Sequence, residues 1–395
     1  ICREGDKNIN SYVYPQYPME KIMDTMRPIY EKAVADAKAA DTPEKRRGVG
    51  IAWGGFNVTE GGGDSAEVAL ELMPGNKIRK YDTWHAMGQG ATTGSLVVTL
   101  EALKEMHLTP EDIQLIQNDT KTCPDTGMAG ASRSLYMDGN ATIIAANKLL
   151  AAMRKEDGTL RTYDEMKAEG IETKYLGRYE TNTTPGLCRL DPNTGIGDPT
   201  PAFTYCLNLA EVEVDTKTGK TTVLKFTCVD FVGRIGNIDA VNGQAYSGIM
   251  HGIGFALKED YADVKKHANM FGAGTSYIKD VPDDINLIHI DGAISDGPFG
   301  SSGASEAFQA SGHCAVLNGI YNACGVRIHE IPALPEKVKA GLDAIAKGEK
   351  PYEPKKYFLG SDMYEELENI KENPVQVGTQ SFYVSLDDPT AERPF

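Results

Sequence analysis

Four short turns hold the residues of this sequence whose types and spacing could bind a charged ligand. Three glycine-containing turns, at residues 87–90, 128–133 and 300–306, each precede an expected helix, and the polar turn at 242–244 lies just inside another. Glycine lets backbone N–H groups approach an anion, and the helix dipole adds about half a positive charge. The pattern is compatible with a long ligand that carries several oxyanions, and equally with four ordinary tight turns in a glycine-rich protein.

Glu306 is the residue in these turns that could act as a general base. It lies in the run GPFGSSGASEAFQ at 297–309. A carboxylate in the first turn of a helix is stabilised by the dipole, so the pattern alone favours a structural role. In the alternative interpretation, the glycine–serine loop places the carboxylate in a cavity, where it could accept a proton from a bound hydroxyl group.

The sequence argues against several other kinds of site. It contains no Walker motif, no GxGxxG after a first strand and no His pair with metal-ligand spacing. A net charge of −16 argues against nucleic acid or an anionic membrane as the main partner. No apolar run approaches the roughly 20 residues that span a bilayer. The seven cysteines form no CxxC pair, so we expect reduced thiols in a cytoplasmic protein, with a periplasmic location left open.

The elements expected to position these turns mix strands and helices along the chain. The first half should contain helices at 19–27, 29–40, 92–106 and 134–155 and strands at 47–56, 65–72, 77–83 and 113–118. A loop-rich connection with one short helix at 163–168 should cover 156–199. The second half should contain a hairpin at 204–230, strands at 284–292 and 326–331, and helices at 239–256, 305–324 and 335–347. This order predicts an α+β (mixed α/β) fold.

Four parts of the chain follow from the same pattern. Residues 1–46 should form a connecting arm, 47–200 a first subdomain, and 201–347 a second subdomain that carries the Glu306 loop. Residues 348–395 are rich in Pro and Glu with little periodicity, so we expect a C-terminal arm that lies on another protein surface or is partly disordered.

The ordered motifs resemble those of the molybdenum hydroxylase (xanthine oxidase) family, most closely its aldehyde oxidoreductase branch from anaerobic bacteria. The resemblance covers residues 47–345 in outline. It rests on GQG at 88–90, GASR at 130–133, NGQ at 242–244, HGIGFALKED at 251–260, GPFGSSGASEAFQ at 297–309 and NACGVRIHEIPALPEKV at 322–338. It implies the C-terminal molybdopterin-binding domain of a molybdenum hydroxylase, with two subdomains of mixed sheet plus helices.

The resemblance also implies roles for individual residues. Glu306 matches the family's catalytic base, Gln89 a glutamine near the metal's apical oxo group, and Gln244 a glutamine that contacts the pterin. The family holds molybdenum through the dithiolene of the pterin, so Gln89 and Glu306 would lie next to the metal without binding it. The other expected cofactor-binding residues are Gly88 and Gly90, the pterin and pyrophosphate loop of Ala129, Gly130, Ala131, Ser132 and Arg133, and Gly303, Ala304 and Ser305 beside the metal.

The implied activity is oxidation of an aldehyde to a carboxylic acid with water as the oxygen source. Bacterial members of this branch usually carry molybdopterin cytosine dinucleotide, so we expect that form, with [2Fe-2S] clusters, and FAD as an optional addition, on other domains or subunits. We expect the N-terminal half of the molybdenum domain as a partner, because its glycine–phenylalanine loop and arginine loop are not found in this sequence. Hydroxylation of an N-heterocycle and a non-catalytic assembly role stay open, although Ser305 and Phe308 offer no charged partner for a purine.

Overall fold

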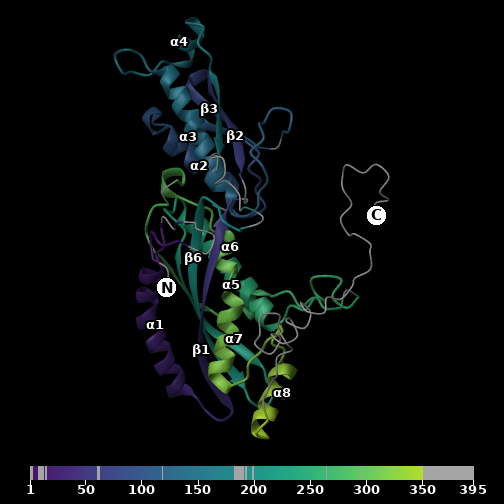
Figure 1. The fold of residues 1–395 in the computed structure, drawn as a ribbon. Coiled ribbons are helices and arrows are strands. Elements are labelled where there is room, and N and C mark those ends of the chain that lie inside the picture. Colours follow the sequence, from purple (N-terminus) through teal and green to yellow (C-terminus); the bar gives the residue numbers. More distant parts are fainter. Residues whose placement is uncertain are drawn as a thin grey trace. The chain divides into compact units, whose positions relative to one another are not determined.

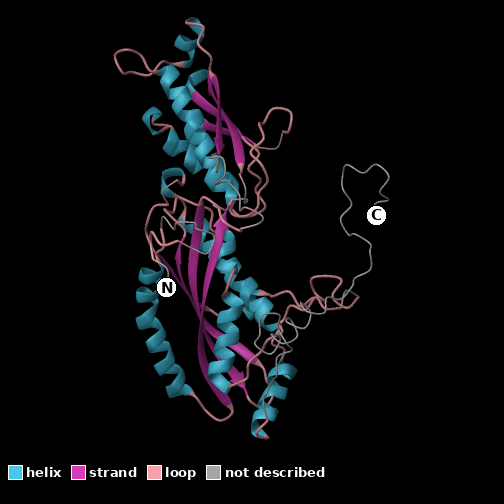
Figure 2. Ribbon diagram, in the orientation of Figure 1, coloured by secondary structure: helices cyan, strands magenta, loops and turns pink. Residues whose placement is uncertain are grey.

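Two four-stranded sheets organise the chain (Figures 1 and 2). The computed structural model describes residues 3–7, 13, 16–59, 63–117, 119–181, 191, 194–197, 200–263, 265–294 and 296–349. In the first sheet the order is β1 (Lys45–Val58), β6 (Ala202–Asp215), β7 (Thr221–Phe231) and β8 (Asp284–His289). In the second it is β4 (Ile113–Ile116), β3 (Lys77–Tyr81), β2 (Ser65–Met73) and β5 (Lys174–Glu180). The expected α+β class is confirmed.

Helices cover both faces of the first sheet (Figure 1). On one face lie α5 (Ile238–Leu257), α6 (Ser305–Gln309) and α7 (Gly312–Cys324), and on the other lies α1 (Met19–Ala40). The central strand β6 is therefore buried on both sides. Its side chains alternate between the two cores: Ala210 packs with the α5–α7 helices, and Leu209 packs on the α1 side.

Glycines in β1 explain how α7 lies directly on this sheet. A Cβ atom on Gly48 would be 2.2 Å from the carbonyl oxygen of Gly319, and one on Gly50 would be 2.1 Å from the carbonyl oxygen of Ala315. Both acceptor atoms belong to the backbone of α7, so a side chain at either position would push the helix away from the strand. The run RGVGIAWGGF at 47–56 therefore encodes close helix–strand packing.

Helices also pack on the second sheet. The helix α3 (Arg133–Met153) packs on β2 and β5, and α2 (Ala91–Ala102) packs on α3. Here too a glycine sets the distance, because a Cβ on Gly177 in β5 would lie 2.0 Å from the carbonyl oxygen of Ala141 in α3. The short helix α4 (Tyr163–Ala168) precedes β5, and α8 (Pro335–Ala346) follows α7 in the chain.

The structure corrects four expectations about the elements. Helices at 19–27 and 29–40 are one helix, α1, with Pro28 inside it, because buried Ile22, Met26 and Ala33 on both sides of the proline pack against the first sheet. The expected helix at 305–324 is broken into α6 and α7. Its break contains Ser311, whose hydroxyl donates to the carbonyl of Ala52 (3.2 Å) and accepts from Asn208 (3.1 Å).

The other two corrections concern strands. Residues 326–331 form no strand, since Val326 instead packs against Gly341 of α8 and Ile328 packs on the first core. The connection expected at 156–199 contains β5, whose Gly177 and charged residues obscure the alternation of a strand.

The two sheets do not correspond to two consecutive stretches of the sequence. Strand β1 precedes the second sheet in the chain but pairs with β6 over its whole length, from Lys45↔Asp215 to Val58↔Ala202. Residues 45–58 thus join the sheet that carries the Glu306 loop. The expected arm at 1–46 contains α1, which packs on this sheet. The expected arm at 348–395 lies outside the described residues apart from 348 and 349. In the part of the chain that the structure describes, no helix is long and apolar enough to cross a bilayer.

Candidate active site

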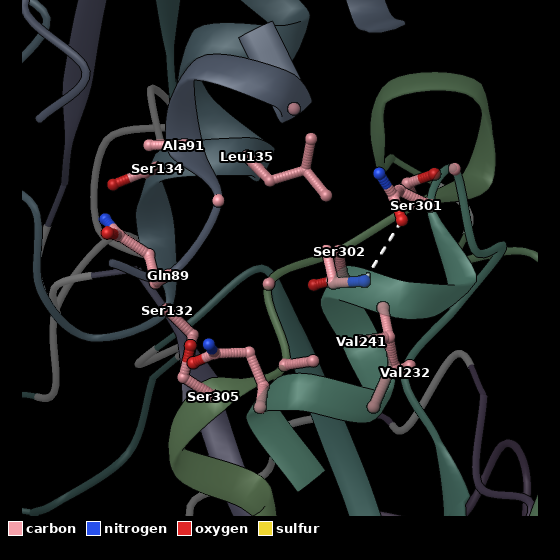
Figure 3. A pocket seen from close by; sticks show the side chains of 18 of the residues that line it. Gln89, Ala91, Ser132, Ser134, Leu135, Val232, Val241, Ser301, Ser302 and Ser305 are labelled. Atoms are coloured by element: carbon pink, nitrogen blue, oxygen red, sulfur yellow. Dashed lines mark hydrogen bonds between the residues drawn. The ribbon is translucent and has the colours of Figure 1, made fainter. Parts of the chain in front are cut away.

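A cavity of about 670 Å³ lies where the four turns come together (Figure 3). Its volume falls within the range of about 300–1,000 Å³ that is usual for small-molecule sites. The expected residues that line it are Gln89, Gly90, Ala129, Gly130, Ser132, Gln244, Gly303, Ala304, Ser305 and Glu306. Gly88, Ala131 and Arg133, which were also expected there, are not among its lining residues. Turns that are up to about two hundred residues apart in the chain therefore share one cavity.

Glu306, in the first turn of α6, is held by Ser132 at the start of α3. The backbone N–H of Ser132 donates to Glu306 Oε1 at 3.2 Å, and the Ser132 hydroxyl donates to Glu306 Oε2. The backbone N–H of Glu306 lies 3.5 Å from the same hydroxyl, which can accept its hydrogen. Two donors from one residue orient the carboxylate at the cavity wall, and they join segments that lie 174 residues apart in sequence.

The backbone of both segments is shaped for this approach. Ala131 and Ser132 have φ angles of 48° and 49°, in the left-handed region that residues with a side chain seldom adopt. On the facing loop, a Cβ atom on Gly303 would lie 1.8 Å from the carbonyl oxygen of Ser132. Only glycine fits at position 303, so the motif GSSGASE is explained by the contact that places Glu306.

Gln89 reaches the cavity from a turn between two glycines with positive φ, Gly88 (103°) and Gly90 (84°). Its side-chain amide folds back on this turn: Nε2 donates to the carbonyl of His85 at 2.7 Å, and Oε1 accepts from the N–H of Met87 at 2.5 Å. Gly88 has the left-handed conformation that this turn requires. It therefore helps to position Gln89, although it does not itself line the cavity.

Arg133 is buried and fully engaged within the protein. Its Nε and Nη2 atoms donate to the two carboxylate oxygens of Asp64 at 2.6 and 2.8 Å. Nη2 also donates to the carbonyl of Ser65 at 2.9 Å, and Nη1 donates to the carbonyls of Thr126 (2.9 Å) and Met128 (2.7 Å). All five N–H groups of the guanidinium are used. Its side chain therefore shapes the loop 126–132 and has no donor left for a phosphate, in contrast to its expected place in a pyrophosphate-binding loop.

Three cavity residues with informative environments were not expected from the sequence. The Ser302 side chain lines the cavity, is 5% exposed, and its hydroxyl oxygen has no hydrogen-bond partner among the described residues. Arg234, an exposed residue, also lines the cavity. Phe299 adopts φ = 55° in the turn before Gly300. Ser302 and Phe299 lie inside a run that the sequence had singled out, whereas nothing in the pattern around 234 marks that arginine.

One wall of the cavity rests on a buried ionic cluster. Lys80 Nζ lies 2.6 Å from Asp138 Oδ1 and 3.2 Å from Asp82 Oδ2, and all three side chains are fully buried. Asp82 Oδ1 also accepts from the backbone N–H of Trp84, whose ring lines the cavity. Burial raises the pKa of Asp138 to about 7, although the charge of Lys80 opposes the rise. The cluster thus fixes the position of Trp84.

Another part of the cavity lining, the start of α5, depends on a histidine that joins α5 to the first sheet. His289 Nδ1 lies 2.8 Å from Asp230 Oδ2, and His289 Nε2 lies 2.8 Å from Asn242 Oδ1. Burial raises the pKa of Asp230, and the hydrogen bond with His289 partly offsets this effect. Asn242 is two residues from Gln244, so these contacts anchor the turn of α5 that faces the cavity.

Comparison with known proteins identifies the family. The model of the molybdopterin cofactor-binding domain matches residues 26–282. The aldehyde oxidoreductase of Megalodesulfovibrio gigas is 39% identical over 342 residues, which are 87% of this chain and 37% of that protein. A probable hypoxanthine oxidase of Escherichia coli is 28% identical over 277 residues, 66% of this chain and 29% of that protein.

Solved structures agree with this result. The crystal structure of the aldehyde oxidoreductase from Desulfovibrio desulfuricans matches with a TM-score of 0.82 and 42% identity, and the match covers 86% of this chain and 37% of that one. This chain therefore spans a little over one third of the length of the aldehyde oxidoreductases that it matches. By sequence and by fold, it belongs to the molybdopterin cofactor-binding domain family of the molybdenum hydroxylases.

Proposed function

We propose that this chain forms the Glu306-bearing wall of a molybdenum hydroxylase site that oxidises an aldehyde to a carboxylic acid. The observation that carries the proposal is the position of Glu306: its carboxylate lines a cavity of about 670 Å³ and is oriented there by two donors from Ser132. A carboxylate that only stabilised a helix start would not need a residue from 174 positions away to hold it.

The cavity fits a pterin cofactor in two respects. The Ser302 hydroxyl is a buried polar group without a partner in the described residues, and such a group is costly unless a ligand satisfies it. Gly303, Ala304 and Ser305 line the cavity beside Glu306, so their backbone groups can contact a ligand there. We propose that the cofactor is molybdopterin cytosine dinucleotide, held by the backbone at 129–130 and 303–305 and by Gln244, with Gln89 and Glu306 beside the metal.

Glu306 would act as the proton acceptor of the reaction. When bound, the cofactor supplies the two-electron oxidation, and water supplies the oxygen atom. Glu306 would remove a proton from a hydroxyl group within reach of its Oε atoms, and Ser132 would keep the carboxylate in position before and after the transfer. Trp84 and Leu135 on the cavity wall would limit the access of bulk water.

Other parts of such an enzyme would lie outside this chain. Because the chain spans 37% of the M. gigas relative, we propose that the N-terminal half of the molybdenum domain completes the pocket. Iron–sulfur clusters, and a flavin where one is used, would accept the electrons on other domains or subunits of a cytoplasmic oligomer. The 28% identity to a probable hypoxanthine oxidase supports a second candidate, hydroxylation of an N-heterocycle, and steady-state rates on an aldehyde and on hypoxanthine separate the two.

The direct test is the Glu306→Gln variant of the whole enzyme complex, purified from the cells that produce it. We expect the rate of aldehyde oxidation to fall by about 10²–10⁴-fold, the usual contribution of a general base, while molybdenum content stays near wild type. Glu165→Gln is the matched control, because Glu165 is also a helix-start carboxylate, in α4, held by the N–H of Thr162 at 2.8 Å. It should lower stability and leave turnover intact. Full activity of the Glu306→Gln enzyme would refute the assignment.

A further inference from the structure

The short helix that carries Glu306 depends on its neighbours for its position. Helix α6 is only five residues long, and its N-cap residue, Ala304, provides no side-chain hydrogen bond. A helix of this length leaves its last carbonyl groups without partners inside the helix, so other segments must supply the donors. The position of α6, and with it that of Glu306, is therefore decided by contacts with α5, β1 and β6 (Figure 1).

Cys206 in β6 supplies one of these donors. Its thiol donates to the carbonyl oxygen of Ala307 at 2.9 Å, and Ala307 is the residue directly after Glu306. The backbone N–H of Ala310 reaches the same carbonyl only at 3.3 Å. Cys206 is fully buried, so no water competes for this bond. The thiol thus joins the first sheet to the turn of helix that presents the carboxylate.

Asn208, two residues further along the same face of β6, holds the residue at which α6 ends and α7 begins. Its Nδ2 donates to the Ser311 hydroxyl at 3.1 Å, and that hydroxyl donates to the carbonyl of Ala52 in β1 at 3.2 Å. The same Nδ2 lies 3.6 Å from Cys206 Sγ. Cys206 and Asn208 therefore form a polar pair at one end of a face of β6 that continues with Ala210, Val212 and Val214.

This polar pair is unfavourable for the core around it. Asn208 is fully buried, and its Oδ1 has no partner among the described residues, which destabilises the fold. Gly54 in β1 leaves the space for the pair, because a Cβ there would lie 2.9 Å from Cys206 Sγ and 2.8 Å from Ser311 Oγ. Apolar side chains at positions 206 and 208 would avoid this cost. Local rules of core packing are broken mainly at functional sites, and this pair lies against the helix of Glu306.

We propose that Cys206 is a positioning residue for Glu306. Ser132 holds the carboxylate of Glu306 from the side of α3, and Cys206 holds its helix from the side of the first sheet. The role deepens the proposed function and rests on it, because the position of α6 affects turnover only if Glu306 is the proton acceptor. Loss of the thiol should let α6 shift, and a shift of roughly 1 Å in a reacting group can lower the rate about 10²-fold.

The first test measures kcat and KM for an aldehyde with the whole enzyme complex. Cys206→Ala should lower kcat about tenfold to a hundredfold and leave KM within about twofold, since the defect lies in the reacting group. Cys206→Ser retains a donor and should recover at least about threefold of this loss. The matched control is Cys324→Ala, because the Cys324 thiol also donates to a backbone carbonyl, that of Ile320 at 3.3 Å, but within α7. Its kcat should equal that of wild type.

Urea denaturation of the full chain without cofactor gives a readout that does not depend on activity. Ser132→Ala and Cys206→Ala each remove a donor to α6, from opposite sides of the helix. Because both act through α6, the change in the unfolding constant of the double variant should differ from the product of the single changes by at least about threefold. The pair Ser132→Ala and Cys324→Ala should show no such coupling, with a difference below about twofold.

Four results would overturn the inference. They are a wild-type kcat in Cys206→Ala, a KM that rises as far as kcat falls, a Cys206→Ser enzyme no better than Cys206→Ala, and independent effects of Ser132→Ala and Cys206→Ala on stability. Coupled effects on stability in an enzyme whose Glu306→Gln variant is fully active would refute the proposed function and leave the contact between Cys206 and α6 standing.

Discussion

Replacing Arg133 with methionine tests whether this residue supports the cavity loop or binds a ligand. The side chain makes a bidentate contact with Asp64 at 2.6 and 2.8 Å and donates to three backbone carbonyls at 2.7–2.9 Å, and the residue is 2% exposed. Methionine would leave the Asp64 carboxylate, 9% exposed, without a counterion. Removing one partner of a buried ion pair costs about 3–5 kcal/mol.

This loss corresponds to an unfolding constant that is larger by about two to three and a half powers of ten. Urea denaturation of the cofactor-free chain would measure it as a lower midpoint with an unchanged slope. Because the defect lies mainly in the unpaired carboxylate, the double variant Arg133→Met with Asp64→Asn should recover part of the loss. Arg133→Lys keeps the charge but cannot make five hydrogen bonds, so it should remain clearly less stable than wild type. A loss below about 1 kcal/mol in Arg133→Met would refute the structural role assigned to Arg133.

Two further predictions concern the cavity walls. Gly303→Ala should abolish molybdenum retention, measured by elemental analysis, because its Cβ would lie 1.8 Å from the Ser132 carbonyl oxygen. The control is Gly243→Ala, since a Cβ at that position has open space around it. An equal loss of molybdenum in the control would contradict the argument. Asp138 has a folded pKa of about 7, above its unfolded value near 4, so its contribution to stability is present at low pH and is lost as pH rises from about 4 to 7. Asp138→Asn should therefore gain in Tm relative to wild type between pH 5 and pH 8, and an identical difference at both pH values would exclude this linkage.

Local patterns were sufficient to predict several elements. The alternation LNLAEVEVD and TTVLKFTCVD around 216–220 predicted the β6–β7 hairpin, which forms with Val214 opposite Thr221. The long apolar helices α3 and α5 also lie close to their expected ranges. These elements were predictable because strand alternation and helical periodicity are properties of neighbouring residues.

Pairings between distant residues could not be predicted in this way. No local feature of RGVGIAWGGF indicates that β1 pairs with a strand about 150 residues later, or that Gly48 and Gly50 lie under α7. Most of the residues that the motifs singled out through resemblance do line the cavity. The engagement of Arg133, and the Ser302 hydroxyl that has no partner among the described residues, depend instead on atoms contributed by other segments. Such properties appear only once the chain is folded.

The contact between Ser132 and Glu306 has a consequence for how the site is assembled in time. Ser132 directly precedes α3, which packs on the second sheet, and Glu306 lies in α6, which packs on the first. The two residues are 174 positions apart, so the contact closes only when these two parts of the chain have come together. Contacts of such long sequence separation form late, since a large loop must be closed first. During refolding, helical signals and the local β6–β7 hairpin should therefore recover before the cavity does. In a nascent chain released early, local helices would be present while the Glu306 carboxylate still lacked its Ser132 donors.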